Sequence, residues 1–418
     1  INNFATMPEG CYQPEDLDKL VPDINLNNTT PLPEVSIEEE DIASIIYTSG
    51  TTGFSKGVVL THKNLVWDAR QCRTIQPVDE TYRFLSILPM AHTYENTLGL
   101  LLPLMFGAQV YYLDRVPTPK LLVPAMQKIR PTVVLSVPLI IEKIYKSQVL
   151  PKFTSSKLMS KLYRFAPARK LFNRLAGKKL METFGGELKF FGIGGSKLDG
   201  TVEQFLREAK FPYAIGYGLT ETAPMAAGSN PSQTFLQGVG PVMEGVQIKI
   251  NDPDKSGQGE IWIKGPNVMK GYYKRPELTA ETFTEDGWFK TGDLGSFDKK
   301  NRLAIRGRIK TMILGASGEN IYPEEIESII NNFRFVNESL VVENSGKLVA
   351  MVHFNMEELE KQYQKLKDQA GNYKEKINDY IEEQKQELRD YVNARVNNFS
   401  KLQLVLVQHE PFEKTPTH

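Results

Sequence analysis

A run of small hydroxyl residues and glycines with one lysine lies between Ile45 and Gly57, IIYTSGTTGFSKG. Short side chains let the backbone approach an anion, hydroxyls and N–H groups donate to it, and the Lys56 ammonium adds a positive charge. The commonest phosphate loop has glycine directly before the lysine and a hydroxyl residue after it, whereas here Ser55 precedes Lys56 and Gly57 follows. By itself the run predicts either a phosphate-binding loop or a plain flexible loop.

The residues on either side would position this loop. Residues 42–47, IASIIY, predict a strand that leads into it, and residues 62–70, HKNLVWDAR, predict a helix beyond it. We therefore expect a strand, the loop and a helix, in that order.

Composition places the 418 residues among ordinary globular proteins, because 41% are hydrophobic and 24% are charged. The 50 basic and 50 acidic residues cancel, so no overall field favours nucleic acid, and we expect no nucleic-acid partner. Cys11 and Cys72 have neither metal-ligand spacing nor a disulfide framework, which predicts a reducing, cytoplasmic location. A peripheral contact with a membrane stays open, as does the oligomeric state.

The most apolar run, residues 98–108, is too short to span a bilayer and contains Pro103, so it predicts a buried helix. The chain starts INNFATMPEG, without an initiator methionine, and we expect a fragment of a longer protein.

The chain divides into four successive regions with different sequence patterns. Residues 1–40 are rich in proline, asparagine and acids and predict an irregular lead-in. Strand-like and helical segments then alternate, which predicts an α/β sheet, until short strands with Gly/Asp turns begin near Gly238. Residues 310–418 predict a small α+β domain, whose charged stretch 356–396 suits a coiled coil or, better, helices packed on one face. The strand-like segments are 83–90, 108–114, 131–138, 188–195 and 213–218, and the helical ones are 119–129, 170–184 and 200–209.

Six motifs occur together in a fixed order: YTSGTTGFSKGVVLTHKNL, LPMAHTYE, GGSKL, YGLTET, GWFKTGDLG and RGRIKTMILGASGENIYPEEIE. The set resembles the adenylate-forming enzymes, and among them most closely the long-chain fatty acyl-CoA synthetases. The segment VPLIIEKIY at 137–145 is also similar to the long-chain branch. The resemblance implies a large multi-subdomain AMP-binding domain, 41–309, with α/β sheets and a β-rich subdomain, and a small mobile α+β domain, 310–418. It also implies that part of the large domain precedes Ile1 and that a catalytic lysine follows His418.

The activity implied by the resemblance is activation of a fatty acid with ATP and Mg²⁺, followed by thioester formation with coenzyme A. A carboxylate attacks the α-phosphorus of ATP and expels pyrophosphate, and a thiol then displaces AMP. In the resemblance, Thr220 bonds the α-phosphate and Glu221 binds Mg²⁺, although a lone Glu221 would predict only a surface acid after a strand. The β- and γ-phosphates would be held by Thr48, Ser49, Gly50, Thr51, Thr52, Gly53 and Lys56.

The same resemblance places the rest of ATP. Tyr217, followed by Gly218, has an aromatic face suited to adenine, and the backbone at Gly194, Gly195 and Ser196 would crowd the base. Asp293 would accept from both ribose hydroxyls, and Arg308 would add a bond to the ribose or a phosphate. Without the other motifs, Asp293 would be interpreted as a turn residue in a Gly-Asp loop.

Three further residues have implied roles in the acyl and thioester steps. His92 would lie beside the fatty-acid carboxylate, although a single histidine more often predicts a satisfied core residue. Lys310 would be the hinge of the small domain, and Gly318 would let the pantetheine arm pass, unless it is a simple turn glycine. Two alternatives remain open: an acyl-carrier-protein ligase of the same fold, and a non-catalytic relic that binds nucleotide or acyl chains.

Overall fold

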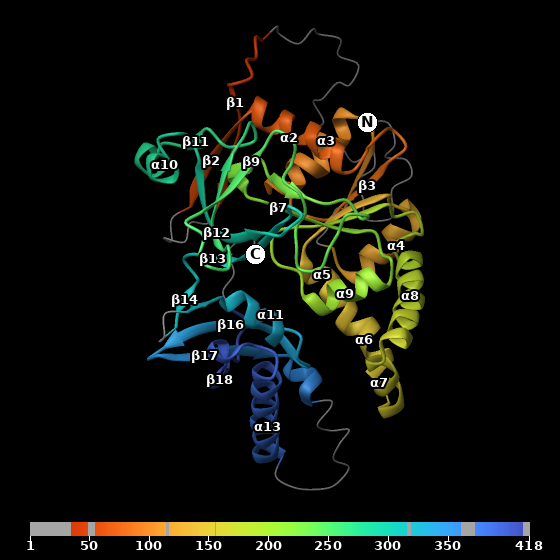
Figure 1. Ribbon diagram of the computed structural model, residues 1–418. Helices are drawn as coiled ribbons and strands as arrows, with labels where there is room; N and C mark the ends of the chain where they lie inside the picture. The colour runs from red at the N-terminus through yellow and green to blue at the C-terminus, as the bar shows by residue number, and fades with distance from the viewer. Residues whose placement is uncertain are drawn as a thin grey trace. The chain divides into compact units, whose positions relative to one another are not determined.

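The structure is a computed structural model, and its chain forms two compact units (Figure 1). The first comprises residues 1–249, 262–291 and 297–304, and the second comprises 250–261, 292–296 and 305–418. The predicted boundary between 309 and 310 stays a prediction. The residues that the structure describes are 35–48, 55–113, 117–154, 156–315, 319–360 and 373–412.

A six-stranded sheet is the centre of the first unit, in the order β4-β3-β5-β6-β7-β8. Its first five strands run parallel and β8 pairs antiparallel with β7. Parallel strands are buried on both faces and therefore have continuous apolar sequences, as in VVLS of β5, where every residue is buried. The predicted α/β class is confirmed. The strands are β3 (Arg83–Ser86), β4 (Gln109–Tyr112), β5 (Val133–Ser136), β6 (Phe190–Ile193), β7 (Tyr213–Gly218) and β8 (Met225–Gly228).

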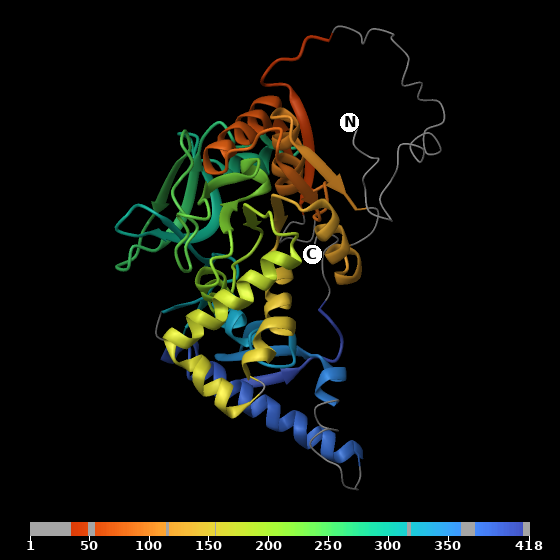
Figure 2. The ribbon, with the colours of Figure 1, turned by 90° about the vertical axis from the view of Figure 1, so that its right-hand side faces the viewer.

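Helices cover this sheet on two sides. Figures 1 and 2 show α2 and α3 on one side and α5, α8 and α9 on the other. On the second side Phe184, Phe191 and Phe211 form edge-to-face pairs with ring centroids 5.5–5.6 Å apart, a geometry that aromatic rings favour. The helices of the unit are α2 (His62–Ile75), η2 (Glu95–Leu101), α3 (Leu102–Met105), α4 (Pro119–Ile129), α5 (Pro138–Ile144), η3 (Tyr145–Val149), α6 (Leu150–Thr154), α7 (Lys157–Arg164), α8 (Ala166–Thr183), α9 (Gly200–Glu208), η4 (Thr220–Thr222) and α10 (Pro276–Thr282).

The apolar run 98–108 forms the end of the π-helix η2 and the short helix α3. Leu98 and Leu102 are buried, whereas Leu104 and Met105 are exposed, so the predicted buried helix is buried on one face only. Among the described residues, no helix combines the length and apolarity that crossing a bilayer requires.

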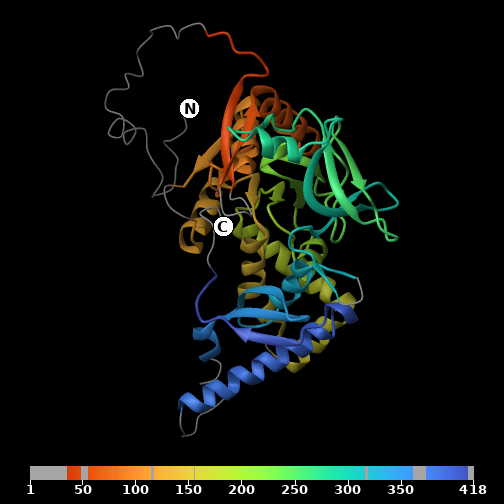
Figure 3. The same cartoon turned by 90° about the vertical axis from the view of Figure 1, so that its left-hand side faces the viewer.

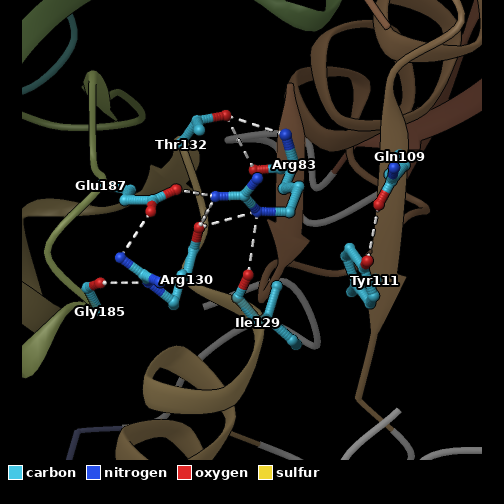
Figure 4. A network of polar contacts seen from close by, with 8 residues as sticks. All are labelled: Arg83, Gln109, Tyr111, Ile129, Arg130, Thr132, Gly185 and Glu187. Atoms are coloured by element: carbon cyan, nitrogen blue, oxygen red, sulfur yellow. Dashed lines mark hydrogen bonds and ion pairs between the residues drawn. The ribbon is translucent and has the colours of Figure 1, made fainter. Parts of the chain in front are cut away.

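The amino-terminal edge of the parallel sheet is held by a polar network (Figure 4). Arg83, at the start of β3, donates to the carbonyls of Ile129 and Arg130 and pairs with Glu187. The guanidinium of Arg130 lies 2.6 Å from the same carboxylate. A planar guanidinium can satisfy several acceptors at once, so this network ties the turns before β5 and β6 to β3.

The strand and the helix predicted on either side of the Gly/Ser/Thr run are present, and a second strand that was not predicted completes a β-hairpin before the helix. Strand β1 (Ile42–Thr48) pairs antiparallel with β2 (Lys56–Thr61), and only then does α2 begin. The residues Val58 to Leu60 explain the second strand, because they are buried and two are β-branched. Helix α2 begins with a capping box, in which Thr61 and Asn64 each accept from the other's backbone N–H.

The β-rich region predicted after Gly238 is present as β9 (Gln247–Asn251), β10 (Gly259–Lys264), β12 (Phe289–Phe297) and β13 (Leu303–Arg308), a sheet in the order β13-β12-β10-β9. Strand β11 (Gly271–Tyr272) instead pairs with β2.

The remaining elements belong to the second unit. Its three-stranded sheet, β16-β17-β18, packs through Val341, Val352 and Val405 against Leu388 and Val392 of α13 (Figure 3). The prediction of packed helices in the charged stretch is therefore confirmed for α13, and residues 361–372 lie outside the described residues. The elements are β14 (Ile313–Leu314), β15 (Asn320–Ile321), α11 (Pro323–Ile330), β16 (Val336–Asn344), β17 (Lys347–Phe354), α13 (Tyr373–Asn393), η5 (Asn398–Ser400) and β18 (Leu404–Val407).

Candidate active site

The carboxyl ends of neighbouring parallel strands bring several predicted residues to one edge of the sheet. The segment with His92 follows β3, the turn with Gly194 and Gly195 follows β6, and Thr220 and Glu221 follow β7. In open parallel sheets, ligands bind outside this edge. The strand order therefore places these motifs where a ligand site is expected.

Lys56 and Glu221, 165 positions apart in the sequence, meet in an ion pair. The Lys56 Nζ lies 2.9 Å from Oε1 of Glu221, which is buried in the 3-10 helix η4. Lys56 is the first residue of β2 and is part-exposed, so its ammonium lies between a buried carboxylate and solvent. The structure thus joins the predicted phosphate lysine to the predicted magnesium ligand.

Tyr272 is a third member of this cluster, and the sequence analysis missed it. Its hydroxyl donates to Oε1 of Glu221 at 2.8 Å and lies 2.6 Å from the Lys56 Nζ, which also lies 4.3 Å from the ring centroid. The pairing of β11 with β2 sets Tyr272 opposite Val58 and so fixes its position. Burial, and secondly the nearby Glu221 carboxylate, raises the pKa of Tyr272, so this hydroxyl stays protonated as a donor.

Thr48 ends β1 and stands opposite Lys56 in the hairpin. Its Oγ1 is buried and has no hydrogen-bond partner in the described part of the chain. A buried hydroxyl without a partner is costly in a folded protein, so this atom is suited to contact a ligand. The other predicted phosphate-loop residues, Ser49 to Gly53, lie outside the described residues.

The backbone around Glu221 is held by side chains. Thr222 accepts from the Leu219 N–H and donates to the Pro224 carbonyl. The buried Asn267 donates to the carbonyls of Thr222 and Met225, at 3.1 and 2.6 Å. These bonds fix both ends of the turn, and with it the direction of the Glu221 side chain.

Gly218 lies under this turn, where no larger residue fits. A Cβ atom at this position would lie 1.6 Å from the Pro224 carbonyl oxygen. The structure therefore gives Gly218, predicted as a nucleotide-binding residue, a packing role that places the strand end directly against the Glu221 turn.

We expect Gly218→Ala to destabilise the protein by more than about 3 kcal/mol, because the added methyl group must push a backbone carbonyl aside. Urea unfolding measures the change. Gly200→Ala is the matched control, since its nearest neighbour would be a side-chain atom at 3.4 Å, at the first residue of α9. Equal stability of the two variants would contradict the close approach seen here.

The glycine turn after β6 has an aromatic neighbour that the sequence analysis missed. Gly194 is buried, and a Cβ there would lie 3.3 Å from the ring of Tyr94. Gly195 has φ +90° and is exposed, as is Ser196, so this backbone is accessible. The side chain of Tyr217 is mostly buried, and its predicted stacking on adenine stays a prediction.

His92 lies half-buried in a turn, and its carbonyl accepts from the Asn96 N–H at 2.8 Å. Close by in the chain, Glu95 is buried at the start of η2. Ser86 donates to its Oε1, while its Oε2 has no partner among the described residues. Burial raises the pKa of Glu95 to about 7, and the hydrogen bond from Ser86 acts in the opposite direction by lowering it.

This raised pKa predicts that the stability of the folded protein depends on pH. In the unfolded chain Glu95 loses its proton near its ordinary pKa, so stability should fall as pH rises from about 4.5 to about 7 and level off above. Glu95→Gln removes the charge, and we expect it to be more stable than the parent at pH 8, by on the order of 3 kcal/mol, with the advantage vanishing near pH 5. Urea unfolding at both pH values measures this, with the exposed Glu80→Gln as control. Parallel pH profiles of parent and Glu95→Gln would contradict the assignment.

In the second unit, Asp293 and Arg308 form an ion pair. Asp293 is buried in β12, and its Oδ1 lies 3.0 Å from Nε of the exposed Arg308 at the end of β13. Lys310, the predicted hinge, is exposed in the turn that follows. The predicted pantetheine residue Gly318 lies outside the described residues.

Comparison with known protein families identifies the chain. The model of the AMP-binding enzyme family matches residues 6–273. The chain belongs to this family. The predicted resemblance to adenylate-forming enzymes, closest to long-chain fatty acyl-CoA synthetases, is thereby confirmed.

Individual relatives agree with this assignment. Long chain acyl-CoA synthetase 6, peroxisomal, of Arabidopsis thaliana is 32% identical over 79% of this chain and 50% of its own length. A long-chain-fatty-acid–[acyl-carrier-protein] ligase of the same plant, chloroplastic AEE15, is 30% identical over 80% of this chain and 54% of its own length. Among solved structures, the ATP-bound RpMatB–BxBclM chimera B1 superposes with a TM-score of 0.70 at 26% identity, covering 92% of this chain and 68% of that one. The chain spans about half the length of these curated relatives.

Proposed function

We propose that the protein activates a long-chain fatty acid with ATP and passes the acyl group to coenzyme A. In the first step a carboxylate oxygen bonds to the α-phosphorus, and the bond from that phosphorus to the bridging oxygen breaks, so pyrophosphate leaves. In the second step the thiolate sulfur bonds to the acyl carbon and AMP leaves. The meeting of Lys56, Glu221 and Tyr272 in the AMP-binding region is the observation that carries the proposal.

The chemistry of this cluster suits a phosphate and cation site. The buried Glu221, preceded in the sequence by Thr220, offers oxygen atoms of the kind that Mg²⁺ takes as ligands. When bound, the cation would disperse the negative charge that builds up on the phosphates. In its absence Lys56 neutralises Glu221, and we propose that ATP draws the ammonium toward the β- and γ-phosphates, near the unpartnered hydroxyl of Thr48.

The remaining roles complete the proposal. Asp293 and Arg308 would hold the ribose, and the bond between them pre-orders the carboxylate for two hydroxyl donors. His92 would lie beside the substrate carboxylate, and Lys310 and Gly318 would serve the thioester step as hinge and pantetheine passage. A cytoplasmic location is part of this proposal.

The choice of a long-chain acid rests on the relatives, which are named as long-chain acyl-CoA synthetases and ligases. A carrier-protein acceptor is the second candidate, because AEE15 is similar at 30% identity. Thioester formation from palmitate and ATP, offered with coenzyme A or with a phosphopantetheinylated carrier protein, separates the two. We expect the coenzyme A thioester and AMP in equal amounts, while thioester on the carrier protein alone would overturn the choice of acceptor.

A further inference from the structure

The helical pair α7 and α8 has an unusual composition for a chain of zero net charge. Residues 157–183 contain eight lysines and arginines and a single acid, Glu182. In Figure 1, α7 lies farther from the parallel sheet of the first unit than α8, which reaches back to the sheet. Because the whole chain has zero net charge, this local excess of seven positive charges is offset by an excess of acidic residues elsewhere in the chain.

Side chains on the inner face of the pair pack against neighbouring residues of the first unit. Phe153 of α6 stacks on Tyr163 and Phe172 with centroids 4.8 and 5.7 Å apart. The Tyr163 hydroxyl donates to Asn173, whose amide donates to Glu208. These contacts fix which way both helices face, and so which side chains point outward.

The outer face is apolar and basic together. On α7 the exposed fractions of Leu158 and Leu162 are 68% and 40%, and on α8 those of Leu171 and Leu175 are 58% and 61%. Each pair is spaced four residues apart and so lies on one side of its helix. Phe165, between the helices, is 62% exposed. The exposed basic residues are Lys161, Arg164, Lys170, Arg174, Lys178 and Lys179, and within the described residues none of them forms an ion pair.

We propose that this outer face docks onto an anionic lipid bilayer, with the leucines and Phe165 entering the interface and the basic side chains contacting lipid phosphates. Helices that lie in a membrane surface combine an apolar stripe with lysine and arginine beside it. A soluble polyanion would pair with the basic residues but would leave five large apolar side chains in water. The charge and the apolar stripe together therefore favour a bilayer over a nucleic acid or an acidic protein.

The proposal does not rest on the proposed reaction, and vesicle binding tests it without measuring activity. Sedimentation with vesicles of phosphatidylcholine, alone or mixed with phosphatidylserine, gives the partition coefficient of the full chain. We expect binding to the mixed vesicles only, weakening as salt rises. Substituting Arg174, Lys178 and Lys179 by glutamine should lower the partition coefficient by about two orders of magnitude. Leu171→Gln with Leu175→Gln should lower it by about tenfold or more.

Matched controls separate this face from a general surface effect. Leu104 has the same exposed fraction as Leu171, 58%, and Leu104→Gln should bind vesicles like the parent. Substituting the exposed Lys255, Lys299 and Lys300 by glutamine should lower the partition coefficient less than the three changes on α8 do. No binding to mixed vesicles would overturn the proposal. Equal losses of vesicle binding in the test and control variants would also overturn it. The same holds if the protein binds heparin but not vesicles, or if it is a dimer that the leucine variant converts to a monomer.

Discussion

Glu221→Gln should lower the rate of fatty-acid-dependent ATP–pyrophosphate exchange by about two to three orders of magnitude. Glutamine keeps the size of the side chain and an acceptor for the Tyr272 hydroxyl, but it removes the charge that would hold Mg²⁺ and that pairs with Lys56. Because the lost interaction is with a cation, we expect raised magnesium to restore part of the rate.

Glu208→Gln is the matched control for this change. Glu208 is also a carboxylate with a basic partner, Arg169 at 2.9 Å, but it lies on α9 away from the strand ends. It should leave the magnesium dependence unchanged. A Glu221→Gln defect that is indifferent to magnesium would make Glu221 a structural residue and would remove the metal from the proposal.

Lys56→Met should cost on the order of 2–4 kcal/mol in the adenylation step, because the leaving pyrophosphate loses one charge-assisted contact. Methionine keeps much of the apolar length of the lysine side chain and removes the ammonium that lies 4.3 Å from the Tyr272 ring centroid, so packing changes little. Fatty-acid binding should be unchanged, since the proposal assigns this lysine to the phosphates. Pyrophosphate exchange and fatty-acid binding, measured side by side, check the prediction.

The control for Lys56 is another lysine of the same hairpin and helix region. Lys63 pairs with Glu40 at 2.9 Å, but both side chains are exposed, so Lys63→Met should have little effect. Combining Lys56→Met with Glu221→Gln adds a sharper test, because residues that act as one unit are not additive. A double variant whose losses simply add would show that the two residues act separately.

The elements with the plainest hydrophobic patterns were predicted best. Residues 213–218 and 119–129 were expected as a strand and a helix, and β7 and α4 have these same bounds. Continuous apolar runs in parallel strands and one apolar face on each helix are local signals, so they can be read without knowing the fold. The short strand β18, Leu404–Val407, was missed, because four residues carry too little pattern.

The β-hairpin and the cluster it builds were not predictable in this way. Strand β2 lies between the Gly/Ser/Thr run and α2, which confirms the helix predicted at 62–70, but the strand itself was not predicted. Tyr272 meets Lys56 across 216 positions, and only the pairing of β11 with β2 brings them together. The resemblance to a family supplied Lys56 and Glu221 separately, whereas their ion pair had no signal in the sequence.

The central claim is that this cluster supports adenylation of a fatty acid, and isotope exchange between pyrophosphate and ATP tests it most directly. The exchange requires reversible formation of the acyl adenylate, and it does not depend on the identity of the later acceptor. The proposal predicts exchange that needs both palmitate and Mg²⁺ and that falls strongly in Lys56→Met and Glu221→Gln. ATP binding without exchange, whatever fatty acid is supplied, would contradict it and would make the protein a nucleotide-binding relic.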